Sequence, residues 1–143
     1  DLMAEQATWP LILSVFTEIY KFQKELGIPE EAILMELYLS KEPALMLEKM
    51  ADVGLYKQMP FHSHTSQYGQ LSRFEEDNKN YIRNFIEEQF KNIESGKFAE
   101  EWKQEQEQGL ERFHELMEKA LQSSISKAEE EVKKKLDYES EEI

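Results

Sequence analysis

The sequence contains no cysteine among its 143 residues. Disulfide bonds, thiolate nucleophiles and zinc sites built on thiolates are therefore excluded within it. The absence of cysteine also fits a reducing compartment, and no basic-then-apolar leader precedes the first apolar stretch. We therefore expect a cytoplasmic protein.

Glycine and proline are scarce, with five and four copies, while 33% of the residues are charged. This composition favours long, solvent-facing helices over a β-sandwich or barrel. The five glycines are too widely spaced to form the phosphate-binding GxGxxG loop of a dinucleotide site. We expect an all-α fold in which residues 1–143 form a single domain.

Positive charge is also limited, because 17 basic residues face 30 acidic ones and the net charge is −13. Such a chain has no basic surface with which to neutralise phosphates, so nucleic acid is not expected as a partner. No apolar run approaches the roughly 20 residues that a membrane-spanning helix needs, so no membrane partner is expected either.

Apolar spacing and the positions of glycine and proline predict the helices. Pro10 should kink or divide the first helix near Trp9, because proline has no N–H and clashes with the preceding turn. Residues 56–69 show no sustained period and are expected to form a loop with one helical turn, whereas residues 122–143 should form a peripheral acidic helical tail. The predicted helices cover residues 1–26, 30–40, 43–53, 72–95, 98–121 and 125–136, and Gly109 is a soft point inside the fifth.

Three acidic residues are candidates for metal binding. Asp1 and Glu5 stand four apart, so on a helix their carboxylates share one face and could hold a hard cation such as Mg²⁺. The same spacing also occurs in solvated acidic pairs that bind nothing. Glu36 lies in an apolar run, where it is either on an exposed edge of the helix or buried with a functional role.

His62, Ser63 and His64 suggest two further chemistries, a His-x-His zinc site and a serine nucleophile. Neither is favoured, because no third zinc ligand is evident and no hydrolase turn surrounds Ser63.

Three blocks of the sequence resemble ketol-acid reductoisomerases. Residues 1–6 (DLMAEQ) are similar to the family's Asp-x-x-x-Glu helix start, and residues 63–69 (SHTSQYG) resemble its Ser-Asn-Thr-Ala-Glu-Tyr-Gly loop. Residues 95–102 (SGKFAEEW) are similar to its Ser-Gly-x-Phe-Ala-x-Glu-Trp element. The blocks occur in the family's order, with the spacing of the C-terminal domain of the short, class I form, and the resemblance covers about residues 1–105.

The resemblance implies a fold, a reaction and a set of roles. The fold would be a knotted helical domain like the C-terminal domain of 6-phosphogluconate dehydrogenase, forming an intertwined homodimer. Asp1, Glu5 and Glu36 would bind Mg²⁺, and Glu36 and Ser63 would reach the substrate from the partner subunit, so these four residues are the implied catalytic set. The substrate would be a 2-acetohydroxy acid of branched-chain amino acid biosynthesis, isomerised and then reduced to a 2,3-dihydroxy acid by NADPH. NADPH would bind an N-terminal Rossmann domain that this sequence lacks, so the isolated chain should be inactive.

The sequence also departs from the family. Ser40 stands where a second Glu is usual four residues after Glu36, Gln67 replaces a Glu, and Pro10 interrupts a stretch of small residues. These departures leave an alternative open, in which the chain is a helical dimerisation module of a paralogue that has lost the isomerisation chemistry. Trp102, in the third block, is expected to be a buried core residue.

Overall fold

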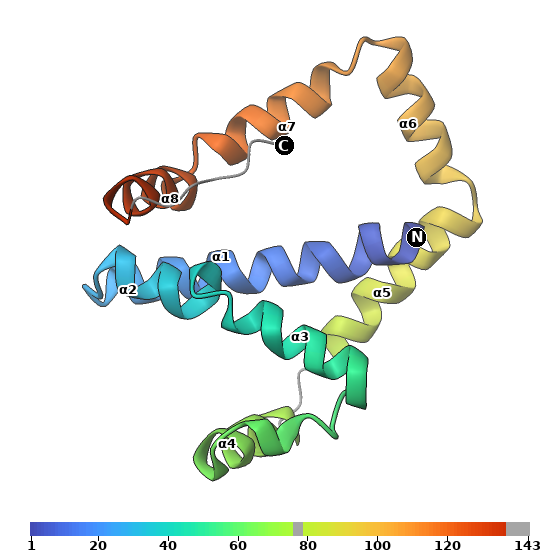
Figure 1. Ribbon diagram of the computed structural model, residues 1–143. Helices are drawn as coiled ribbons and strands as arrows, with labels where there is room; N and C mark the ends of the chain where they lie inside the picture. Colours follow the sequence, from blue (N-terminus) through green and yellow to red (C-terminus); the bar gives the residue numbers. More distant parts are fainter. Residues whose placement is uncertain (76–78, 137–143) are drawn as a thin grey trace. The chain divides into compact units, whose positions relative to one another are not determined.

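The computed structural model describes residues 1–75 and 79–136, shown in Figure 1. Every regular element in those residues is helical and none is a strand, which confirms the all-α prediction. Packing contacts divide the chain into two compact units, residues 1–34 with residues from 85 onward, and residues 35–84. The elements are η1 (Ala4–Thr8), α1 (Trp9–Glu25), α2 (Glu30–Leu34), η2 (Met35–Leu39), α3 (Glu42–Val53), η3 (Met59–Phe61), α4 (His64–Glu75), α5 (Lys79–Glu94), α6 (Lys97–Glu107), α7 (Glu111–Leu121) and α8 (Ser124–Lys135).

The first helix changes its hydrogen-bonding pattern just before Pro10. Segment η1 is π-helical, and the N–H of Trp9 donates to the carbonyl of Ala4, five residues back. Helix α1 follows directly from Trp9, with Pro10 as its second residue. The interruption predicted near Trp9 therefore takes the form of a change in hydrogen-bonding pattern, and the helical backbone continues through it. The helix ends before Gly27, whose φ of +78° lies in the left-handed region that glycine adopts readily.

The predicted helix over residues 30–40 is confirmed in position, but its second half is π-helical. Helix α2 covers Glu30–Leu34 and η2 covers Met35–Leu39. The N–H of Ser40 donates to the carbonyl of Met35 over 3.3 Å, again a five-residue span. Helix α3 follows with a proline in its first turn and ends at Gly54, as predicted.

The prediction of a loop over residues 56–69 is wrong for its second half. A short 3₁₀ turn, η3, occupies Met59–Phe61, and α4 begins at His64. Periodicity missed this start because the first turns of α4 are polar. Its start is set instead by a capping residue, since the hydroxyl oxygen of Ser63 accepts a hydrogen bond from the N–H of Ser66 (3.2 Å).

The single helix predicted over residues 98–121 is also wrong. Helix α6 ends at Glu107 and α7 begins at Glu111. Between them, Gly109 and Leu110 both have positive φ, +76° and +64°, which an uninterrupted α-helix cannot contain. The helix predicted over residues 72–95 is described as α4 up to Glu75 and as α5 from Lys79, with a C-terminus at Glu94.

The core of the first unit is small and involves the C-terminal helix. Tyr20, Ile33 and Leu34 are fully buried or nearly so, and Ala128 and Val132 of α8 are buried with them. Helix α8 packs against α2, and its own start is capped by Ser123, whose hydroxyl accepts from the N–H of Ser126. The division of the sequence at residue 122 into domain and tail stays a prediction, and residues 137–143 lie outside the described part of the chain.

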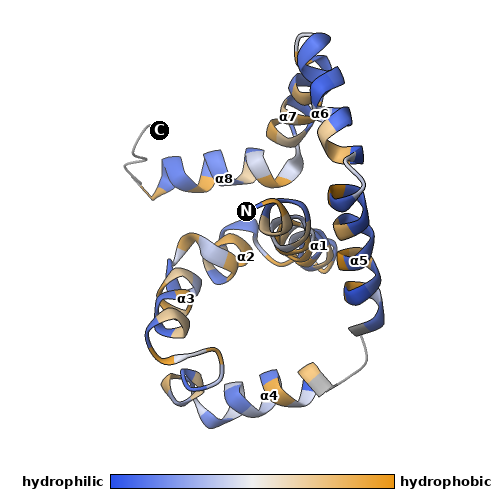
Figure 2. Cartoon of the chain, turned by 90° about the vertical axis from the view of Figure 1, so that its right-hand side faces the viewer, coloured by the Kyte–Doolittle hydropathy of each residue, from blue (hydrophilic) through white to orange (hydrophobic). Residues whose placement is uncertain are grey.

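Large apolar side chains remain exposed on several helices. Leu13 of α1 is 63% exposed, and Trp102 of α6 is 43% exposed, so the prediction that Trp102 is a core residue is wrong for this chain. In Figure 2, α1 is orange over much of its circumference, whereas α5 and α8 are mostly blue with intervening orange residues. Within residues 1–75 and 79–136, no helix is long and apolar enough to span a bilayer.

Candidate functional site

Asp1 and Glu5 stand one turn apart at the start of the first helix, as predicted. The N–H of Glu5 donates to the carbonyl of Asp1 over 3.1 Å, so the two residues belong to one continuous helical turn. Both side chains are exposed, and Glu5 lies inside the π-helical segment η1. A π-helical turn inside an α-helix is rare and is frequently found at functional sites.

A cavity of about 380 Å³ opens beside Glu5. Gln6 is one of its lining residues, and the side-chain amide nitrogen of Gln6 is buried without a hydrogen-bond partner among the described contacts. The lining residues are Glu5, Gln6, Pro10, Phe85, Gln89, Asn92, Phe98 and Glu101.

Two residues of the third sequence block line this cavity. Phe98 and Glu101, both within residues 95–102, line the same cavity as Glu5 of the first block. The sequence reasoning singled out neither Glu101 nor Gln6 as a candidate site residue. Their place in two resembling blocks was the available signal, because blocks distant in the sequence often meet at one site.

Glu36 also lies in a π-helical segment, η2, and its side chain is exposed. This settles the choice left open by the sequence in favour of the exposed position. Ser40, at the end of the same segment, uses its hydroxyl oxygen to accept a hydrogen bond from the N–H of Glu42 (3.3 Å), near the start of α3. Ser40 therefore supplies an acceptor for a backbone N–H at the start of α3.

Within the described residues, no three His, Asp or Glu side chains come together as a metal-binding group. The expected set of Asp1, Glu5 and Glu36 is therefore not assembled by the described residues of this chain. His64 is the first residue of α4, while His62 precedes it in extended backbone, and the two do not form a zinc site with a third ligand.

Ser63 caps the N-terminus of α4 with its hydroxyl oxygen and its carbonyl. The carbonyl accepts from the N–H of Gln67 over 2.9 Å, and the hydroxyl oxygen accepts from Ser66. Because the cap uses only a lone pair of the hydroxyl, the O–H proton of this exposed side chain remains available to donate to a ligand.

A buried amide holds the backbone before Ser63. Gln58 is 1% exposed, and its amide nitrogen donates to the carbonyl of Leu55 over 3.2 Å. Its amide oxygen lies 2.9 Å from Nε2 of His62, which must therefore carry a proton and donate. The amide of Gln67 donates to the carbonyl of His62 over 2.8 Å. The glutamine that departs from the family pattern thus makes a bond that an ionised glutamate could not make.

A second polar cluster ties α1, α2 and α8 together. The hydroxyl of Tyr20 donates to the carboxylate of Glu30 over 2.6 Å, and Lys24 pairs with the same carboxylate over 2.9 Å. The carbonyl oxygen of Ser124 lies 3.1 Å from the Tyr20 hydroxyl oxygen. Burial raises the pKa of Tyr20. The hydrogen bond from Tyr20, and then that from Lys24, lowers the pKa of Glu30. This cluster fits a structural role, because each group in it has a partner.

Comparison with known proteins identifies the family. The family model for "Ketol-acid reductoisomerase, C-terminal domain" matches residues 1–137 of the chain. The chain belongs to the ketol-acid reductoisomerase family. It is 37% identical over 137 residues to "Putative ketol-acid reductoisomerase 3" of Saccharolobus solfataricus, a match that covers 94% of this chain and 40% of that protein. It is also 26% and 29% identical to proteins named "Ketol-acid reductoisomerase (NADP(+))" of Pyrobaculum calidifontis and Pyrobaculum aerophilum, with 95% of this chain and 41% of each relative covered.

The chain thus spans about 40% of the length of the ketol-acid reductoisomerases that it matches. The match extends beyond residue 105, where the resemblance in the sequence blocks stopped, and includes α7 and α8. The helices that follow the third block are therefore part of the family domain.

Proposed function

We propose that this chain is the metal- and substrate-binding domain of a ketol-acid reductoisomerase that converts 2-acetohydroxy acids to 2,3-dihydroxy acids. The observation that carries the proposal is the helical turn of Asp1 and Glu5 in a chain that matches the family's C-terminal domain along nearly its whole length. Two relatives are named for NADP(+), so NADPH is the expected reductant, bound by the part of the protein that this chain does not cover.

Asp1 and Glu5 have the donor chemistry that Mg²⁺ requires. Both supply carboxylate oxygens, the ligands preferred by hard cations, and both are accessible from solvent. Glu36 would complete the site from a second copy of the chain. When bound, Mg²⁺ supplies Lewis-acid polarisation of substrate oxygens. The protein's own contribution is to hold the carboxylates in place and to keep their lone pairs free for the ion.

Ser63 is suited to bind the substrate rather than to attack it. Its hydroxyl oxygen accepts from the N–H of Ser66, which leaves the O–H free to donate. Such a donor can recognise a carboxylate or hydroxyl oxygen of a 2-acetohydroxy acid. No basic side chain is bonded to the Ser63 hydroxyl among the described contacts, as a nucleophile would require.

We also propose that the domain acts as a homodimer. The described buried apolar core consists of eight residues, whereas several helices expose large side chains. Helix α7 has no buried residue, although Phe113, Leu116, Met117 and Leu121 recur on it at helical spacing. Exposed apolar surface of this extent is typical of chains that are completed by a partner. Sedimentation of the full-length protein would test this, and a monomer at micromolar concentration would contradict it.

The metal assignment is tested by titrating the full-length protein with Mn²⁺, a spectroscopically visible stand-in for Mg²⁺. Replacing Asp1 by Ala should remove the tight site while leaving helicity unchanged. Glu111 and Glu115 of α7 provide a matched control, because they have the same four-residue spacing on an exposed helix. If Glu111→Ala weakened binding as much as Asp1→Ala, the acidic surface as a whole would be binding the ion and the site assignment would be wrong.

Ser40 is the observation that favours the alternative, a dimerisation module without isomerisation chemistry. Reductoisomerase activity with 2-acetolactate, NADPH and Mg²⁺ should be measured on the full-length parent and on its Ser40→Glu variant. Turnover by the parent would support a working, divergent enzyme. Activity in the variant alone would indicate a paralogue whose missing carboxylate ended that chemistry.

A further inference from the structure

The feature that distinguishes the start of the first helix is the π-helical turn that carries Glu5. The five residues of η1 end at Thr8, and α1 is a regular α-helix from Trp9 onward. Pro10 stands at the change between the two patterns. It also lines the cavity that contains Glu5 and Gln6.

Proline chemistry explains why the change occurs there. In an uninterrupted α-helix the residue at position 10 would donate its N–H to the carbonyl of Gln6, but proline has no N–H and its ring clashes with that carbonyl. Inserting one extra residue into the turn relieves the clash, and Trp9 then donates to Ala4 instead of to Glu5.

The extra residue has a geometric consequence for the carboxylates. Each residue of an α-helix advances the side chains by about 100° around the axis. A one-residue insertion therefore rotates everything before it by about 100° relative to α1. Asp1 precedes the π-helical turn, and Glu5 and Gln6 lie within it, so the face on which they stand relative to α1 depends on this turn.

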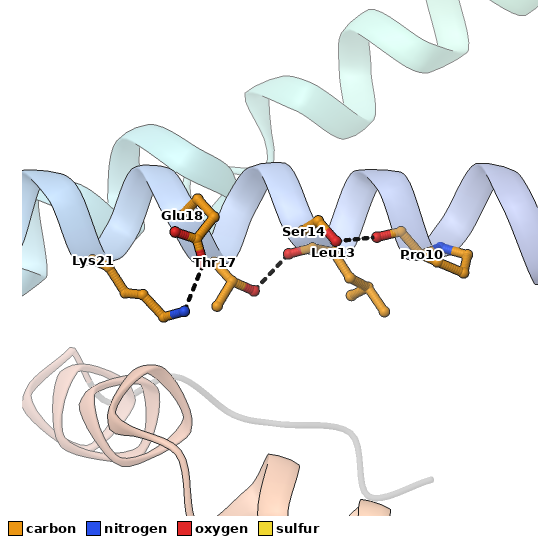
Figure 3. A network of polar contacts seen from close by, with 6 residues as sticks. All are labelled: Pro10, Leu13, Ser14, Thr17, Glu18 and Lys21. Carbon is orange, nitrogen blue, oxygen red and sulfur yellow. Dashed lines mark hydrogen bonds and ion pairs between the residues drawn. The ribbon is translucent and has the colours of Figure 1, made fainter. Parts of the chain in front are cut away.

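The helix after Pro10 provides a fixed frame for this rotation. The hydroxyl of Ser14 donates to the carbonyl of Pro10 over 2.8 Å, and the hydroxyl of Thr17 donates to the carbonyl of Leu13 over 2.5 Å (Figure 3). Both bonds reach back four residues within α1. Because α1 is α-helical from Trp9 onward, the π-helical pattern is confined to the turn before Pro10.

We propose that Pro10 is a positioning residue that sets the rotation of the Asp1–Glu5 face through the π-helical turn. This inference rests on the proposed metal-binding function of Asp1 and Glu5, and it explains a residue that departs from the family pattern. Pro10 does not contact the ion. It acts through the backbone, by deciding which side of the helix the two carboxylates occupy.

The test compares two proline variants of the full-length protein. Pro10→Ala should restore the N–H at position 10, allow a regular α-helix, and lower the affinity for Mn²⁺ by about 10- to 100-fold, the range seen when groups that orient metal ligands are lost. Pro43→Ala is the matched control, because Pro43 lies in the first turn of α3, where no N–H is used. A crystal structure of Pro10→Ala and Mn²⁺ titration by electron paramagnetic resonance give the two readouts, and thermal unfolding verifies that both variants fold.

The possible outcomes distinguish a wrong role for Pro10 from a wrong metal site. A regular helix with weakened Mn²⁺ binding in Pro10→Ala, and unchanged binding in Pro43→Ala, supports the proposal. A retained π-helical turn, or a regular helix with unchanged affinity, overturns it. If the parent binds Mn²⁺ no better than its Asp1→Ala variant, the metal site itself is wrong and the role of Pro10 falls with it.

Discussion

Replacing Tyr20 by Phe removes a single hydroxyl group from the buried cluster that joins α1, α2 and α8. The Tyr20 side chain is fully buried, at 0% exposure, and its hydroxyl donates to the Glu30 carboxylate over 2.6 Å. Phe keeps the ring and its packing, so the change isolates the polar contribution. A hydrogen bond to a charged group contributes about 1.5–3 kcal/mol.

The lower end of that range is expected for Tyr20→Phe. Glu30 keeps its ion pair with Lys24 at 2.9 Å, and its side chain is 38% exposed, so water can replace part of the lost bond. The variant also leaves the Ser124 carbonyl without the nearby hydroxyl. We expect a loss of about 1.5–2 kcal/mol in the free energy of unfolding at pH 7.

The effect should depend on pH in a defined direction. The pKa of Glu30 is lowered from its ordinary value of 4.5 by its hydrogen bonds from Tyr20 and Lys24. A lowered pKa in the folded state means that the stabilisation is present above the ordinary value and is lost as pH falls through the lowered one. The difference between parent and Tyr20→Phe should therefore be largest near neutrality and shrink below about pH 4.

The assay is urea unfolding at constant protein concentration, from pH 3 to pH 7. Tyr81→Phe is the matched control, because Tyr81 is 72% exposed on α5. A double-mutant cycle of the parent, Tyr20→Phe, Glu30→Gln and the double variant would assign the energy to the Tyr20–Glu30 pair. Equal stability of Tyr20→Phe and parent at pH 7, or a loss that stays constant into acid, would refute the reasoning.

Three further predictions concern the backbone and the Ser63 loop. Gly96→Ala should lower the unfolding free energy by about 1 kcal/mol, because Gly96 has a φ of +76° after α5. Gly69→Ala inside α4 should raise it by about 0.5–1 kcal/mol in the same urea-unfolding assay. Gln67→Glu should lose about 1 kcal/mol at pH 7 and regain it in acid, because only a protonated carboxyl can donate to the His62 carbonyl; a pH-independent loss would contradict this. Gln58→Leu should speed hydrogen exchange at the Ser66 and Gln67 amides, and unchanged rates by mass spectrometry would show that Gln58 does not support the loop.

Much of the fold could be predicted from local chemistry. Proline and glycine act through their own backbone geometry, so the interruption near Trp9 and the ends at Gly27, Gly54 and Gly96 were readable without any tertiary information. The break between α6 and α7 was only partly readable, because Gly109 marked a soft point but the positive φ of Leu110 occurs at a residue that ordinarily continues a helix. The start of α4 was missed because a capping serine leaves no hydrophobic period.

The candidate site also has features that the sequence predicts and features that depend on how the helices pack. Asp1 and Glu5 share a face because they stand four apart, which is a property of the chain alone. The cavity beside Glu5 joins residues of η1 and α1 to residues of α5 and α6, which are distant in the sequence, so the shared position of Glu5 and Glu101 could be seen only once those helices were packed. Glu36 was ambiguous for the same reason, since its apolar neighbours predict neither burial nor exposure.

The sequence by itself determined that the chain is helical, that it carries two acidic residues one turn apart, and that it resembles ketol-acid reductoisomerases in three ordered blocks. These properties follow from composition, spacing and local backbone geometry. Only the tertiary structure decided that Glu101 lines the same cavity as Glu5 and that Tyr20 joins α8 to α2. Both arrangements bring together residues far apart along the chain, and no local pattern specifies which of many possible neighbours a side chain will meet.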